Sequence, residues 1–261
     1  MKTKLALLFT LMAVFNDAFC TDKDDSQEKK KEKKTFKHIY IGVSATPSLS
    51  YRYLHGSFVP AGNSQENIQG IIDYSNKHSV PELGVNVAAK VGINITHWLA
   101  IESGVGYSLI RYRYNSDQFY TPSIWNGNNY VPADSFKTRD KETYHYLTIP
   151  IGLRFSIGHR KMRGIIAAGA ELDFLLQQRA DYTYTYANGV TQSSTIIQQT
   201  NNFNTFNISP YLGIGIDCYL SPAVVLRVMP QAQIQGLKNT NTPITEYLWN
   251  AGLNISFLFG L

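Results

Sequence analysis

Residues 83–96, LGVNVAAKVGINIT, decide the fold of this chain. Leucine, valine, isoleucine and alanine fill every odd position from Leu83 to Ile95, and glycine, asparagine, alanine, lysine and threonine fill the even positions. Successive side chains of a β-strand point to opposite faces of its sheet, so this two-residue period indicates a strand with one apolar and one polar face. The only charged residue, Lys90, lies on the polar face.

The same period recurs in seven further segments, at residues 38–45, 99–109, 146–155, 166–174, 206–219, 224–235 and 249–261. In each segment the apolar residues decide which alternate positions form the apolar face. The charged residues of the eight segments then fall on the polar faces: Lys90, Glu102, Arg154, Glu171, Asp173, Asp217 and Arg227. An Arg or Lys that faces lipid at mid-membrane costs roughly 2–4 kcal/mol, so a membrane barrel must show this pattern. A soluble sandwich, whose apolar faces form the core, would show it too.

Two features favour the barrel. The polar faces are rich in Gly, Ser, Asn and Tyr, which suits a narrow, filled lumen better than a solvated surface. The connections also alternate: they are short near 96–98, 158–163 and 220–223, and long at about 54–80, 115–142 and 178–204. Outer-membrane barrels have short periplasmic turns and long external loops. We therefore predict an all-β fold, an eight-stranded antiparallel transmembrane β-barrel with up-and-down topology, in a Gram-negative outer membrane with both termini in the periplasm.

Composition limits the other classes. The mean hydropathy of −0.19 excludes a bundle of membrane helices but not a barrel, whose strands are only half apolar. The net charge of +5 depends on lysines in residues 1–34. Those in residues 23–34 are interleaved with acidic residues, and no basic stripe remains on a folded element, so we expect no binding of nucleic acid.

The N-terminus resembles a signal peptide. Lys2 and Lys4 precede an apolar stretch at 5–15, and Ala18-Phe19-Cys20 places small residues before a cleavage point. We expect a signal peptide at 1–20, a disordered, charged periplasmic tail at 21–37, acting as a spacer or a tether, and the outer-membrane barrel at 38–261. Lipidation at Cys20 is the alternative to cleavage after it. Cleavage would leave Cys218 as the only cysteine, and no intrachain disulfide.

The long connections carry structure of their own. Residues 64–76 predict a short helix with Ile68, Ile71 and Ile72 on one side, and residues 182–197 predict a hairpin, turning at Asn188-Gly189, that continues the fifth and sixth strands above the membrane. Two girdles of aromatic residues are expected at the membrane interfaces. They comprise Tyr51, Tyr53, Tyr112, Tyr114, Tyr144 and Trp249 toward the long loops, and Trp98, Tyr219, Phe257 and Phe259 toward the short turns.

Two groups of residues are candidates for function. The inward charges predict an ion-paired lumen network in which Lys90 lies diagonal to Glu102, and this network is either a structural plug or a small gated pore or proton path. The second candidate is a loop surface that contacts a partner or a glycan, or packs on itself: Phe119, Tyr120, Trp125 and Tyr130. The six histidines are scattered, with no catalytic triad or metal-ligand spacing, so we expect no enzyme, cofactor or metal.

The segment from Tyr146 to Phe155, YLTIPIGLRF, resembles the Y-L-x-I-P-L-x-L strand of the PorT-like outer-membrane β-barrel family of Bacteroidota. Gly169-Ala-Glu171 and residues 252–257, GLNISF, are also similar to that family. The resemblance implies an eight-stranded barrel in the outer membrane, and some members serve type IX secretion. No site residue is carried over from it.

Three hypotheses follow for the function. The favoured one is a non-enzymatic barrel, in contact with outer-membrane lipid, that acts through its extracellular loops or within a complex with an envelope protein. The alternatives are an accessory component of type IX protein secretion and a small ligand-binding or conducting barrel.

Overall fold

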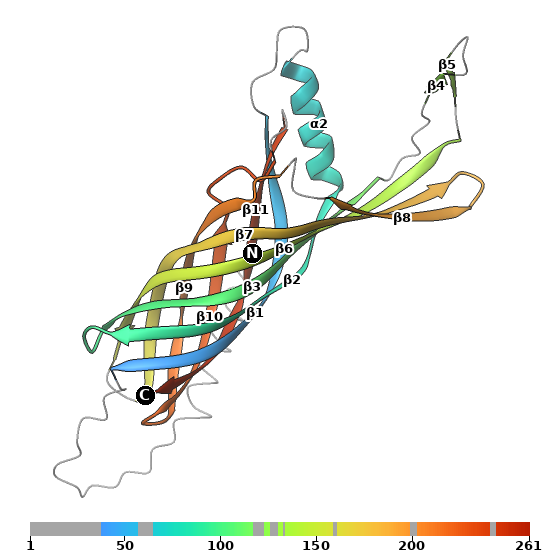
Figure 1. Ribbon diagram of the computed structural model, residues 1–261. Coiled ribbons are helices and arrows are strands. Elements are labelled where there is room, and N and C mark those ends of the chain that lie inside the picture. The colour runs from blue at the N-terminus through green and yellow to red at the C-terminus, as the bar shows by residue number, and fades with distance from the viewer. Residues whose placement is uncertain are drawn as a thin grey trace, which may run out of the picture. The chain divides into compact units, whose positions relative to one another are not determined.

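The computed structural model describes residues 38–56, 65–116, 123–125, 130–132, 134–158, 161–198, 203–240 and 244–261. The predicted signal peptide and charged tail therefore lie outside the described residues. Antiparallel strands dominate the described part, as Figure 1 shows. None of its helices is long and apolar enough to cross a membrane.

Eight long strands form a closed ring. They are β1 (Ile39–Gly56), β2 (Ser79–Asn94), β3 (Leu99–Asn115), β6 (Phe136–Ile157), β7 (Met162–Tyr186), β9 (Phe206–Ser221), β10 (Val224–Ile234) and β11 (Ile244–Gly260). Each is antiparallel to its neighbours, and β1 pairs with β11 to close the ring. Closure leaves no unpaired edge within the ring. The predicted all-β, eight-stranded, up-and-down barrel is confirmed.

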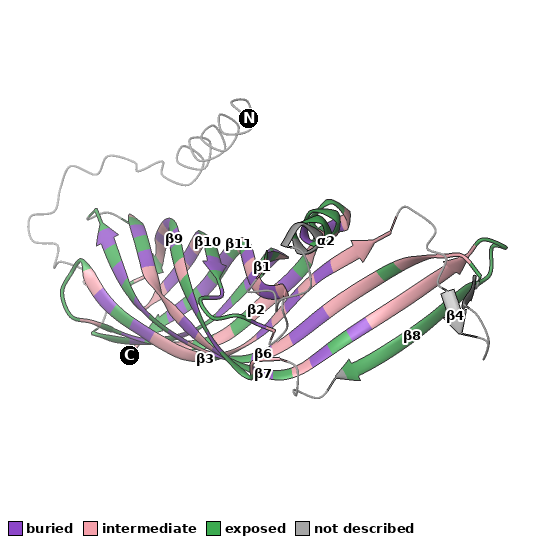
Figure 2. Cartoon of the chain, turned by 90° about the horizontal axis from the view of Figure 1, so that it is seen from above, coloured by how far each residue is buried: buried purple, intermediate pink, exposed green. Residues whose placement is uncertain are grey.

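Burial separates the barrel from the soluble sandwich. Exposed and buried residues alternate along the strands, as the bands of Figure 2 show, and the exposed face is the aliphatic one. Leu83 is 70% exposed, whereas Arg227 is completely buried. In a sandwich the aliphatic faces would form the core. This chain instead encloses its polar faces, which is the arrangement of a barrel surrounded by lipid.

The strands on one side run further than predicted. β6 begins at Phe136 and β7 runs to Tyr186, so parts of the expected loops 115–142 and 178–204 are strand. These parts lack apolar alternation, but Thr and Tyr, which favour strands, are frequent in them. Beyond the ring, β6 and β7 project together with β8 (Thr191–Gln198), visible in Figure 1.

The predicted hairpin at 182–197 is present, and Gly189 adopts a φ of 84° at its turn. Its role differs from the prediction, which continued the fifth and sixth strands through it. β8 pairs with β7 alone, and β9 begins separately at Phe206, pairing with Phe174 further down β7. A short second hairpin is formed by β4 (Ser123–Trp125) and β5 (Tyr130–Pro132).

The predicted helix at 64–76 is observed as α2 (Gln65–His78), which leads directly into β2. Ile72 is buried and Ile71 is 51% exposed, so the side of the helix on which both were predicted to lie is only partly buried. Each residue advances about 100° around a helix, so Ile71 points away from the narrow strip around Ile72 that contacts the barrel. Tyr51 of β1 holds the end of the helix by donating to the carbonyl of Asn76 at 3.2 Å.

The aromatic girdles are only partly as predicted. Trp98 lies exposed at the short-turn end and stacks on Phe155, and Phe257 and Phe259 are exposed beside the same end. Tyr112 and Tyr144, however, are buried inside the barrel, and Tyr219 packs against an inner cluster. They share the strand phase of the inward residues, so they fill the lumen rather than an outer girdle.

Candidate functional site

The lumen contains a ring of four alternating charges. Arg227 of β10 binds Asp217 of β9 and Glu102 of β3, with N–O distances of 2.8 Å in both cases. Arg154 of β6 binds the same two carboxylates, at 3.0 Å to Glu102 and 3.2 Å to Asp217. All four side chains are buried. Two cations and two anions therefore neutralise one another in the interior.

Strand register brings these charges together. Asp217 lies directly opposite Arg227 in the β9–β10 pair. Glu102 pairs with Gly152, two residues from Arg154 on β6, so those two side chains are diagonal neighbours. Further donors complete the ring, because the Tyr40 hydroxyl donates to Glu102 at 2.5 Å. A buried ion pair is stable only when its remaining hydrogen-bonding capacity is satisfied in this way.

The other three predicted lumen residues lie outside this ring of salt bridges. Lys90 lies diagonal to Glu102, since Gly92 is the residue paired with Glu102. Glu171 accepts a hydrogen bond from Asn86 at 3.0 Å, and Asp173 accepts one from Ser209. Within the described residues, Asp173 has no cation within 4.0 Å, and its Oδ1 has no hydrogen-bond partner.

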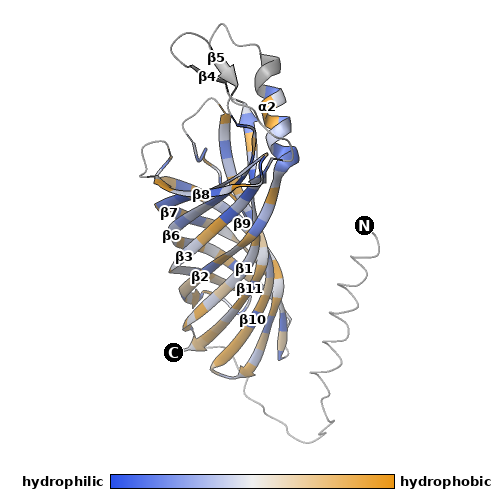
Figure 3. Cartoon of the chain, turned by 90° about the vertical axis from the view of Figure 1, so that its right-hand side faces the viewer, coloured by the Kyte–Doolittle hydropathy of each residue, from blue (hydrophilic) through white to orange (hydrophobic). Residues whose placement is uncertain are grey.

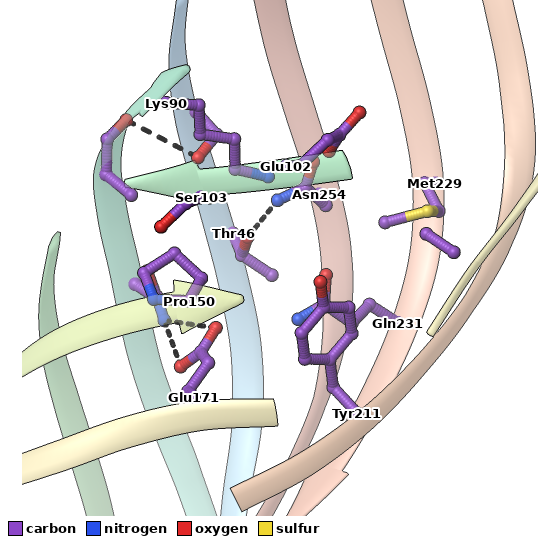
Figure 4. A pocket seen from close by; sticks show the side chains of 14 residues that line it. Thr46, Lys90, Glu102, Ser103, Pro150, Glu171, Tyr211, Met229, Gln231 and Asn254 are labelled. Carbon is purple, nitrogen blue, oxygen red and sulfur yellow. Dashed lines mark hydrogen bonds between the residues drawn. The ribbon is translucent and has the colours of Figure 1, made fainter. Parts of the chain in front are cut away.

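The lumen is filled rather than open. A gap beside the charge ring leaves about 20 Å³ for the centres of water molecules, which is room for one or two of them. Figure 4 shows Lys90, Glu102, Glu171 and Tyr211 around this gap. A Cβ atom added to Gly152 would lie 2.0 Å from the Tyr211 hydroxyl, so this glycine makes room for the tyrosine ring.

A second buried cluster closes the long-loop side of the lumen. Glu246 of β11 accepts hydrogen bonds from the hydroxyls of Tyr112 at 2.8 Å and Tyr144 at 2.9 Å. Arg52 contacts the same carboxylate at 3.4 Å, and Asn239 donates to it at 3.2 Å. Glu246 precedes the eighth strand predicted from apolar alternation, so that pattern did not reveal it. The alternate-residue spacing of the tyrosines near 112 and 144, in phase with the polar faces, was the available signal.

Two more carboxyl groups lie in β6 beyond its membrane-facing segment. Burial, together with the charge of Glu246, raises the pKa of Glu142 to about 7. Burial raises the pKa of Asp140 to about 6. Gln178 of β7 donates a hydrogen bond to Glu142. This end of the lumen therefore gains and loses protons close to neutral pH.

The predicted loop-contact residues are placed only in part. Trp125 and Tyr130 pair across the β4–β5 hairpin, while Phe119 and Tyr120 lie outside the described residues. Within the described part of the chain, no group of three or more His, Cys, Asp and Glu side chains is arranged to hold a metal ion. His145 contacts the Tyr107 hydroxyl on the outer surface.

Comparison with known proteins gives a family match over most of the chain and solved structures with a similar fold. A family model described as an outer membrane protein beta-barrel domain matches residues 26–230. The solved structure of Neisserial surface protein A is 12% identical, with a TM-score of 0.37 over 86% of this chain and 97% of that one. OprG from Pseudomonas aeruginosa is 6% identical, with a TM-score of 0.37 over 86% and 97%. No curated protein matches this chain.

Proposed function

We propose, because this chain belongs to the family of outer membrane protein β-barrel domains, that it is a non-conducting, non-enzymatic outer-membrane protein that acts through its long-loop end. In the proposed orientation this end faces the cell exterior, and both termini face the periplasm. One observation carries the proposal. The lumen is filled by ion pairs and tyrosines, whereas the long-loop end is extended by strands β6, β7 and β8 beyond the ring.

The filled lumen argues against a channel. Side chains fill the interior of an eight-stranded barrel, and the ring around Arg227 and Glu102 joins opposite walls. Movement of an ion past this ring would require buried salt bridges to break, and removal of one partner of such a pair costs about 3–5 kcal/mol. Planar-bilayer recordings of the refolded protein should show no conductance steps. Regular single-channel steps would contradict this part of the proposal.

The projecting sheet offers a surface for an envelope protein partner. β8 pairs with β7 on one side, and no strand of the described residues pairs with its other side. Its sequence, TQSSTIIQ, lacks the charges and prolines that commonly protect edge strands. On β6 and β7, Phe136 packs edge-to-face with Tyr184 and Tyr186. A free strand edge on a sheet that carries exposed polar and aromatic residues suits an extended peptide that adds a strand to the sheet.

Cross-linking from this edge tests the partner. A photoactivatable residue at Ser194 should capture an envelope protein in growing cells, and Ile196→Lys should abolish capture because a charge on an edge strand opposes pairing. Thr205→Lys, at an exposed position immediately before β9, is the matched control. Equal capture by both variants would contradict strand addition.

The orientation needs its own test. In a Cys218→Ser background, Ser193→Cys on β8 should react with a membrane-impermeant maleimide on intact cells. Lys161→Cys, in the turn between β6 and β7, should react only after the outer membrane is permeabilised. The reverse pattern would overturn the proposed orientation.

A second candidate function is support of type IX secretion. The strand from Tyr146 to Phe155, YLTIPIGLRF, supports it through its resemblance to PorT-like barrels. Deletion of the gene should then stop the export of type IX cargo proteins. Normal export in the deletion strain would exclude this role and leave the edge-strand proposal intact.

A further inference from the structure

A cluster of basic side chains lies on the outer face of three adjacent strands, just beyond the aliphatic band. The basic patch consists of Arg111 and Arg113 on β3, Arg139 and Lys141 on β6, and Arg179 on β7. β3, β6 and β7 are consecutive in the ring. Figure 3 shows hydrophobic colours concentrated along the lower barrel and hydrophilic colours around β8 and the strands beside it.

Strand register places these residues on one surface. Thr143 of β6 pairs with Arg111 on one side and with Arg179 on the other. Lys141, two residues along β6, pairs with Arg113. Residues paired across strands or separated by two positions share one face of a sheet, so the five basic side chains point outward together.

The patch lies at the depth expected for lipid headgroups. Leu147 and Ile151 of β6 are 39% and 48% exposed and mark the aliphatic band. Arg111 lies two residues beyond Leu109, the last outward aliphatic residue of β3. Two residues of a strand rise about 7 Å, and the strand tilt makes the change in depth smaller. The guanidinium group of Arg111 therefore lies within a few ångströms of the end of the band.

Acidic neighbours neutralise only part of the patch. Glu82 contacts Arg113 and also Lys141, the latter at 3.5 Å, and Asp181 binds Arg179 at 2.9 Å. Among the described residues, Arg111 and Arg139 have no acidic group within 4.0 Å. The Nε of Arg111 is buried and lacks a hydrogen-bond partner. The patch thus keeps an excess of positive charge and an unsatisfied donor.

A histidine lies beside this surface and does not neutralise it. His145 lies between the two strands that carry Arg111 and Arg179, where Tyr107 forms a hydrogen bond to its Nδ1. The positive charge of the patch belongs to the arginines and the lysine.

We propose that the basic patch binds the phosphate groups of a phosphorylated lipid in the outer leaflet, whose acyl chains pack on the aliphatic band below. Arginine presents several N–H donors in a planar fork that matches phosphate geometry. Because the patch is continuous with the lipid-facing surface, the ligand it fits is a membrane lipid rather than a soluble anion. This inference rests on the proposed orientation of the barrel.

Binding of a defined lipid tests the proposal. The full-length protein, refolded in neutral detergent, is titrated with diphosphorylated lipid A, and retained lipid is measured by native mass spectrometry. The double variant Arg111→Gln/Arg179→Gln should weaken retention roughly 10- to 30-fold, since each basic residue near a membrane surface contributes about 1 kcal/mol. The control double variant Lys161→Gln/Lys238→Gln removes the same charge from exposed positions away from the patch and should bind as the native protein does.

The same assay separates the other outcomes. Dephosphorylated lipid A should bind weakly to every variant, and equal retention of both lipids would overturn phosphate recognition. Equal retention of diphosphorylated lipid A by the patch variant and the control would overturn the site. If inorganic phosphate or a soluble sulfated oligosaccharide displaces the lipid completely, the patch serves a soluble anion, and the lipid proposal is wrong. A maleimide test that reverses the orientation would be a separate failure, because lipid retention in detergent does not depend on orientation.

Discussion

Nη1 of Arg227 donates to both carboxylate oxygens of Glu102, at 2.9 Å and 2.8 Å. The two residues are 125 positions apart in the sequence and belong to β10 and β3, which stand on opposite sides of the eight-stranded ring. This contact crosses the lumen, so it joins walls that share no backbone hydrogen bonds. It stabilises one cross-section of the barrel and blocks the path through it.

Replacement of Arg227 should therefore destabilise the barrel strongly. Arg227→Met leaves Glu102 and Asp217 with only Arg154 as a direct salt-bridge partner, and a buried charge without its partner costs about 3–5 kcal/mol. Urea unfolding in lipid vesicles, followed by tryptophan fluorescence, should show a lower midpoint. The double variant Arg227→Met/Glu102→Gln removes one charge of each sign and should lose less stability than the single variant. A double variant that is less stable than the single one would contradict this explanation.

Gly169 is expected to tolerate no side chain. A Cβ atom added there would lie 2.2 Å from the carbonyl oxygen of Ile151 and 2.6 Å from the Cα of Gly152, which are backbone atoms and cannot rotate away. Gly169→Val should lower stability by about 1–3 kcal/mol or prevent folding, as overpacking does. Gly164→Val on the same strand is the control, because its nearest neighbouring atom lies 3.9 Å away. Heat-modifiable mobility on a gel measures both, and similar behaviour of the two variants would count against the packing.

The assignment of the lipid-facing surface predicts the effect of a charge on it. Ile151 lies in the middle of the outward aliphatic residues of β6. Ile151→Arg should cost about 2–4 kcal/mol of stability in a bilayer, the range for Arg or Lys at the membrane midplane. Ile197→Arg, on the exposed surface of β8 beyond the ring, should change stability little. A tolerated Arg at position 151 would argue against a membrane-embedded band at this height.

Glu142 should make stability depend on pH. Its pKa is raised from 4.5 to about 7 in the folded protein, so the folded state binds the proton more tightly than the unfolded state does. The contribution of Glu142 to stability is therefore greatest at low pH, falls as the pH rises from about 4.5 to about 7, and then levels off. Glu142→Gln stays neutral and should lose about 3 kcal/mol less across this window.

Asp140, with a pKa of about 6, contributes in the same direction and remains in both proteins. Unfolding midpoints measured at several pH values should give a flatter profile for Glu142→Gln than for the native protein. The exposed carboxyl group of Asp134 offers a matched control, since Asp134→Asn removes a charge without changing the buried cluster. Parallel profiles for the native protein and Glu142→Gln would show that Glu142 is not the titrating group.

The strands could be predicted from the sequence where the surrounding lipid requires every second residue to be apolar. The apolar alternation of residues 83–96 and its seven counterparts gave the strands and their phases because lipid excludes charge from one face. At the long-loop end, β6 and β7 continue without apolar alternation, so this pattern could not predict their full length. Tyr112 and Tyr144 were misplaced because aromatic residues near strand ends were assigned to the interfaces, although their phase is that of the inward residues. Glu246 was missed because it precedes the apolar alternation of the eighth strand.

The sequence by itself determined which residues of each strand face inward, because strand geometry fixes that choice within a few neighbouring residues. It also determined the order of short turns and long connections. Only the tertiary structure decided which inward residues meet, since ring closure brings Arg227 to Glu102 and Glu246 to Tyr144 across the lumen. It likewise assembled Arg111, Lys141 and Arg179 on one outer surface, because the pairing of three strands, rather than the sequence of any one, sets their separation.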